Sequence, residues 1–86
     1  MEKEKTYNDL FDFVEDKCNF RKDKKGKFVW NCNGKLRFVE EFFILNKINK
    51  QIQENVIAKL KKCGGYCDCE VIFNCMDNID KNMLIK

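Results

Sequence analysis

Three of the chain's six cysteines lie in one short segment, residues 63–69. The paired glycines Gly64 and Gly65 stand inside this segment and permit a tight reversal of the backbone. Such a turn can bring neighbouring thiols onto one ion, at the Zn–S distance of about 2.3 Å that tetrahedral zinc requires. We therefore predict a structural metal site, with zinc as the expected ion and with ligands Cys63, Cys67 and Cys69.

The fourth ligand must come from elsewhere in the chain, and we expect it to be Cys32. This residue ends a predicted strand, and pairing with a strand that follows Cys69 would bring the two thiols together. The chain has no histidine, so a closed site is all-thiolate or uses Asp68 or Cys75 in place of one thiol. Cys18 and Cys75 are otherwise interpreted as small buried apolar residues. Iron and Cu(I) also suit thiolates, and a redox pair is a further alternative.

The composition indicates a small intracellular domain. The N-terminus has no apolar segment of the kind found in secretory signals, so we expect a cytoplasmic protein. Clustered cysteines in that reducing compartment are more often metal ligands than disulfides. No stretch approaches the roughly 18 apolar residues that a membrane span requires, so no membrane association is expected. The net charge of +3 does not by itself indicate nucleic-acid binding.

The pattern of apolar residues predicts a single α+β domain over residues 1–86, with about three helices and a short two-stranded β-sheet, stapled by the metal. Helical spacing recurs in three segments, and runs of β-branched and aromatic residues indicate two strands. Gly64 is expected to end the third helix in the left-handed conformation. The expected helices are residues 6–17, 35–46 and about 52–60; the expected strands are 28–31 and 70–74, paired with each other, and a basic loop is expected at 19–27.

The run Gly-Gly-Tyr-Cys-Asp-Cys-Glu-Val-Ile at residues 64–72 carries a resemblance to a known family. Together with the helix that precedes it and Cys32 upstream, it resembles a small uncharacterised bacterial family catalogued as domain of unknown function 2695. The resemblance covers about residues 32–74, a family-like core. Residues 1–31, with the N-terminal helix, the basic loop and the first strand, lie outside it.

Two positions of that family bear on the metal site. The family usually has His where this chain has Cys63, and both residue types bind zinc, so the resemblance implies that Cys63 is a ligand. The family often has His at the position of Gly34, which implies a site that differs in this chain. The resemblance implies no reaction.

The small size and the thin core favour a protein-interaction module, such as a regulatory protein or a phage or mobile-element inhibitor of a host system. Apolar residues on more than one face of the second helix leave room for a protein partner or for a second copy in a homodimer. Catalysis is a third hypothesis, with zinc-activated water and Glu70 or Asp68 as the base, but thiolate-rich sites are usually structural. We therefore expect no enzymatic activity.

Nucleic-acid binding is the alternative function. A basic segment next to aromatic side chains combines attraction for phosphates with surfaces on which bases can stack. The residues that would bind nucleic acid are Arg21, Lys22, Lys24, Lys25, Lys27 and Trp30.

Overall fold

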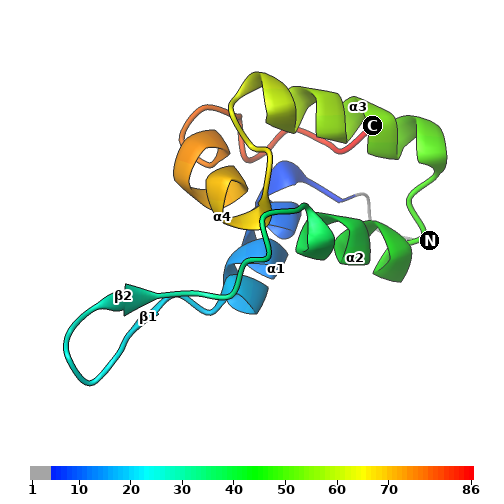
Figure 1. Ribbon diagram of the computed structural model, residues 1–86. Coiled ribbons are helices and arrows are strands. Elements are labelled where there is room, and N and C mark those ends of the chain that lie inside the picture. Colours follow the sequence, from blue (N-terminus) through cyan, green and yellow to red (C-terminus); the bar gives the residue numbers. More distant parts are fainter. Residues whose placement is uncertain (1–4) are drawn as a thin grey trace.

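A bundle of helices with one projecting β-hairpin forms the computed structural model, which describes residues 5–86 (Figure 1). The predicted small α+β domain is confirmed. In chain order the elements are α1 (Tyr7–Cys18), β1 (Arg21–Lys22), β2 (Phe28–Val29), α2 (Arg37–Leu45), α3 (Lys50–Lys62), α4 (Asp68–Glu70) and the π-helical turn η1 (Val71–Cys75), which continues α4.

Helix α1 forms where the periodic pattern predicts it. The Thr6 hydroxyl accepts a hydrogen bond from the backbone N–H of Asp9 at 3.3 Å, and the Asp9 carboxylate accepts from the backbone N–H of Thr6 at 2.8 Å. This reciprocal pair satisfies two amides that the helix start leaves without partners. The inner face of α1 is fully buried and supplies a large part of the core, with Leu10, Phe11, Val14 and Cys18.

Helices α2 and α3 are also present as predicted. Asn49 caps α3 by accepting from the backbone N–H of Ile52 at 2.9 Å. Gly64 follows α3 with a φ of +88°, which confirms the expected left-handed residue at the helix end. The core side chains that α2 and α3 contribute are Val39, Phe43, Val56 and Leu60.

The predicted pairing of strand 28–31 with strand 70–74 is wrong. Strand β2, which lies in the predicted strand 28–31, pairs with β1, which lies in the predicted loop 19–27; the pairing is antiparallel, in the register Arg21 to Val29, so the sheet is a local hairpin. Residues 68–75 are helical instead. Asp68, Val71 and Cys75 are all buried, and their spacing of three and four places them on one helix face. Burial of that face outweighs the strand preference of the Val-Ile-Phe run.

A buried carboxylate holds α2 against α4. The Asp68 side chain is 0% exposed and accepts hydrogen bonds from the backbone N–H groups of Phe38, at 3.1 Å, and Val39, at 3.2 Å. The backbone N–H of Asp68 donates to the Lys35 carbonyl at 3.0 Å. The cap position of α2 is Leu36, which has no side-chain acceptor to offer. Asp68 therefore caps α2 from a distant part of the chain.

The two ends of the described chain pair with each other. Thr6 and Leu84 form an isolated antiparallel bridge, and the backbone N–H of Tyr7 donates to the Met83 carbonyl at 3.0 Å. This contact closes the core beside α1. None of the helices in residues 5–86 is long and apolar enough to cross a membrane.

Replacing Asp68 with Ala should strongly destabilise the fold, because it leaves the Phe38 and Val39 amides buried without acceptors. We expect a loss of about 2–4 kcal/mol in the free energy of unfolding, measured by urea denaturation in the presence of a chelator. Asp68→Asn keeps one carbonyl acceptor and should lose less. Equal stability of Asp68→Ala and the wild type would contradict the capping role.

Candidate metal centre

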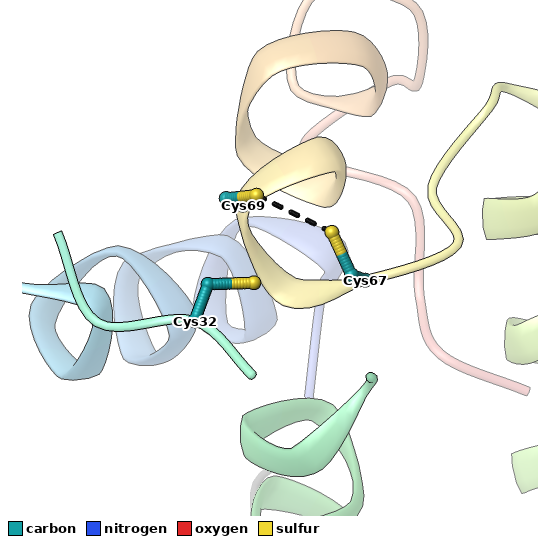
Figure 2. Close-up of side chains that lie close together, drawn as sticks. All are labelled: Cys32, Cys67 and Cys69. Carbon is teal, nitrogen blue, oxygen red and sulfur yellow. Dashed lines mark hydrogen bonds between the residues drawn. The ribbon is translucent and has the colours of Figure 1, made fainter. Parts of the chain in front are cut away.

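Three thiols meet at the junction of the hairpin and α4. The Sγ atoms of Cys32, Cys67 and Cys69 all lie within 4.8 Å of one another. Those of Cys67 and Cys69 are 3.3 Å apart, and the Cys32 side chain points toward the turn that carries them (Figure 2). Two sulfurs bound to one tetrahedral zinc ion stand about 3.8 Å apart. The three thiols therefore lie close enough together to hold a metal ion.

The elements around the site fix these thiols in different ways. Cys32 follows β2, and the chain before it is tied to α1 by a hydrogen bond of 2.7 Å from the Asn31 N–H to the Cys18 carbonyl. Cys67 and Cys69 lie on either side of Asp68, whose carboxylate is held by α2. Successive residues at the start of a helical turn point in different directions. Asp68 is turned inward to α2, whereas the two flanking thiols point toward each other and lie within 4.8 Å of the Cys32 sulfur (Figure 2).

The electrostatics of the site favour a negative charge on Cys32. Burial alone would raise the pKa of this thiol, but hydrogen bonds from the backbone N–H groups of Cys69 and Gly34 outweigh it. The neighbouring thiols of Cys69 and Cys67 add to this effect, and the net result is a lowered pKa for Cys32. Backbone amides that point at a sulfur stabilise its thiolate form, which is the form that binds metal.

The other two thiols are protonated more readily. Burial is the largest cause that raises the pKa of Cys67 to about 12; the neighbouring Cys69, Cys32 and Glu70 side chains act in the same direction, and the backbone N–H of Glu70 acts against them. Burial likewise raises the pKa of Cys69, although the Trp30 side chain opposes this as a hydrogen-bond donor. Three clustered sulfurs cannot all be thiolates without a cation, and a metal ion would supply the compensating charge.

Cys63, the fourth predicted ligand, does not lie in this group. It stands at the C-terminal end of α3, where its thiol interacts with that of Cys75. The Gly64–Gly65 turn carries the chain away from Cys63 before it reaches Cys67, so the turn separates the thiols that it was expected to join. Cys32 does lie in the group, although the strand pairing that predicted it does not form.

The alternatives for the fourth ligand are also placed elsewhere. The Asp68 carboxylate is engaged by α2, and Cys75 is buried with its thiol 3.3 Å from the Leu60 carbonyl. Cys18 and Cys75 are fully buried, which confirms their interpretation as core residues, and burial raises the pKa of each to about 12. Within residues 5–86 no fourth His, Cys, Asp or Glu joins the three thiols.

An aromatic cluster adjoins the thiols. Its members are exposed to different degrees, but each ring lies near at least two others: Phe20, Phe28, Trp30 and Phe73. This cluster was not predicted from the sequence; in it, Phe73 comes from the helical turn η1 and not from a strand. The five basic residues proposed for nucleic-acid binding are all exposed on the adjoining hairpin, and Trp30 is 39% exposed.

Substitution of single cysteines should separate ligands from bystanders. Cys32→Ser, Cys67→Ser and Cys69→Ser should each lower bound zinc well below the wild-type level of about one equivalent, since each removes one of three clustered thiolates. Cys63→Ser is the matched control and should keep its zinc. Elemental analysis of purified protein measures both. Less than about half an equivalent of any transition metal in the wild type would reject the site, and loss of zinc in Cys63→Ser alone would show that the thiols were assigned wrongly.

Comparison with known proteins identifies a family for this chain but no activity. A search of curated proteins and a search of solved structures each returned no match. The family match begins within α1 rather than at Cys32, so the N-terminal helix and the hairpin are part of the shared pattern. Residues 10–74 match the family described as Protein of unknown function (DUF2695), and the chain belongs to that family.

Proposed function

We propose that this domain is a small metal-stapled protein-interaction module, in which zinc bound by Cys32, Cys67 and Cys69 holds an exposed aromatic surface in place. One observation carries the proposal: the three clustered thiols come from the same two parts of the chain as the aromatic cluster, namely the hairpin with the residues after it and the helical segment of α4 and η1. Cys32 and Trp30 belong to the hairpin strand and its extension, whereas Cys69 and Phe73 belong to α4 and η1.

The aromatic cluster is large and accessible. Phe28 is 50% exposed and Phe73 is 51% exposed, although both are bulky apolar side chains. The centroids of the Phe20 and Phe73 rings are 5.3 Å apart, and Trp30 meets Phe73 edge-on at 5.5 Å. Exposed apolar patches of this kind indicate binding surfaces, and aromatic residues supply much of the energy at protein interfaces.

The metal site and the aromatic cluster are mechanically coupled. Trp30 is two residues from Cys32, and its indole is near enough to Cys69 to lower the pKa of that thiol against the effect of burial. A hairpin with only two-residue strands is marginally stable by itself. A bound ion at the three thiols would fix the base of the hairpin on α4, and so fix Trp30 against Phe73.

A structural role for the ion is favoured over a catalytic one. Three thiolates donate enough charge to weaken the Lewis acidity that activates water. Asp68, one expected base, is occupied by the α2 amides. Glu70, the other, interacts with the Cys67 thiol and raises its pKa. This arrangement supports a domain that acts by binding, as a regulatory protein or an inhibitor of a host system does.

The cysteines are consistent with action in the cytoplasm. All six are free thiols in the structure, including the pair Cys67 and Cys69, whose sulfurs are only 3.3 Å apart. Free clustered thiols persist in a reducing compartment and are oxidised outside it. We propose the cytoplasm as the site of action on this ground.

Nucleic-acid binding is the second candidate, and the exposed lysines next to Trp30 and Phe28 favour it. Stacking rings beside cationic side chains are typical of surfaces that bind single strands. It ranks second because three carboxylates, those of Asp12, Glu15 and Asp16, line the same surface as the rings.

Selection from a random peptide library tests the interaction function. The zinc-loaded protein should enrich peptides that bind it at least about tenfold more tightly than they bind the double variant Phe28→Ala/Phe73→Ala, because each deleted ring removes contact area at the centre of the surface. Chelation of zinc should reduce binding in the same way. Ile44→Ala, which removes a 75% exposed side chain on α2, is the matched control and should bind normally.

The outcome that counts against the proposal is equal binding of the selected peptides by the wild type and the double variant. Retention of single-stranded RNA at low salt, lost in the double variant, would favour the second candidate instead.

A further inference from the structure

A groove lies between α1 and the base of the hairpin, with a volume of about 570 Å³. Aromatic rings of the cluster, Phe20, Phe28 and Phe73, form one part of its lining. The other part comes from one face of α1, where polar residues recur at helical spacing: Asp12, Glu15, Asp16 and Asn19. A side chain with an apolar stem and a cationic head would suit both parts, which identifies lysine or arginine as the occupant.

No ion pair within residues 5–86 neutralises the negative charge of this groove. Lys17 and Glu41, 3.8 Å apart, form the only ion pair among residues 5–86. The Asp12 carboxylate accepts a long hydrogen bond from Asn8, of 3.4 Å, which brings no charge. The groove therefore presents carboxylates to whatever binds against the rings.

The hairpin carries the opposite charge. Lys22, Lys24, Lys25 and Lys27 are all exposed on it. Its one acidic residue, Asp23, is tied into the turn, where its carboxylate accepts from the backbone N–H groups of Lys25 and Lys27 at 2.8 and 2.9 Å. The end of the hairpin is therefore a cationic surface, and the structure pairs none of its lysines with a carboxylate in residues 5–86.

The hairpin cannot place its own end in its own groove. It projects away from the helices, with the turn at its far end and the groove at its base (Figure 1). Two hairpins side by side and antiparallel would bring each turn to the base of the other. The roughly four residues from Phe20 to the turn span about 13 Å at 3.3 Å per residue, so two such hairpins would overlap over about this length.

We infer that the aromatic cluster binds a second copy of this chain, with the lysines of each hairpin in the acidic groove of the other; this inference rests on the proposed interaction function. The contact is two-fold symmetric and closes on itself, as in most homodimers. The outer edges of β1 and β2 have no strand partner in residues 5–86, so backbone pairing can add to the contact. The groove carboxylates repel a polyanion from the rings, which favours a second copy over nucleic acid.

Charge exchange between the two surfaces tests the inference, with sedimentation velocity as the readout. The zinc-loaded wild type should form a reversible dimer that weakens about tenfold or more between 50 and 500 mM NaCl. Lys24→Glu/Lys25→Glu should be monomeric, because the turn of its hairpin, residues 23–25, then carries three carboxylates and faces an acidic groove. Asp12→Lys/Asp16→Lys should also be monomeric, because its basic hairpin faces a basic groove.

Mixing the two monomeric variants should restore the dimer, since the turn of each hairpin, residues 23–25, then meets a groove of opposite charge. Lys61→Glu/Lys62→Glu makes the same change in net charge on α3 and should dimerise like the wild type. A wild type that remains monomeric at every concentration would overturn the inference, as would a mixture that stays monomeric. A monomer that still selects peptides through Phe28 and Phe73 would overturn self-association alone and leave the interaction function standing; a monomer that binds single-stranded RNA would overturn both.

Discussion

The structure depends on one buried carboxylate, that of Asp68. A charged or polar side chain with no exposed surface is costly unless its hydrogen bonds are satisfied. Burial raises the pKa of this carboxyl, whereas the amides of Phe38, Val39 and Arg37 lower it. Those amides open helix α2, which has no cap of its own. The Asp68 carboxylate therefore receives the hydrogen bonds that its burial requires, and the first amides of α2 receive the acceptor that the helix start requires.

The position of the candidate metal centre follows from that contact. Asp68 faces α2, and Cys67 and Cys69 on either side of it are thereby held beside the chain that leaves the hairpin, where the Cys32 thiol lies within 4.8 Å of both (Figure 2). The hydrogen bond from Asp68 to the Lys35 carbonyl holds that part of the chain close. The same junction supports the aromatic cluster. The cap of α2, two of the three clustered thiols and one ring of the aromatic cluster thus lie in one short segment, residues 67–73.

The helical spacing of apolar residues was sufficient to predict α1, α2 and α3, because each buries one stripe of apolar side chains. The prediction failed for residues 70–74, where a β-prone run is helical. Two signals pointed the other way: the helical spacing of Asp68, Val71 and Cys75, and Leu36 as a poor cap for α2, which requires an acceptor from a distant residue. The expectation for Cys63 failed because closeness in sequence across a Gly-Gly turn does not fix the direction in which side chains point. The place of Cys32 beside Cys67 and Cys69 depends on a long-range contact, which no local sequence pattern predicts.

The central claim is that three thiolates from the hairpin and α4 bind one metal ion. X-ray absorption spectroscopy of the zinc-loaded protein tests it most directly, because it measures the number and type of atoms around the ion. A shell of at least three sulfurs at about 2.3 Å is predicted, with one sulfur fewer in Cys32→Ser and no change in Cys63→Ser. A shell of only nitrogen and oxygen, or a sulfur shell that Cys32→Ser leaves intact, would contradict the claim.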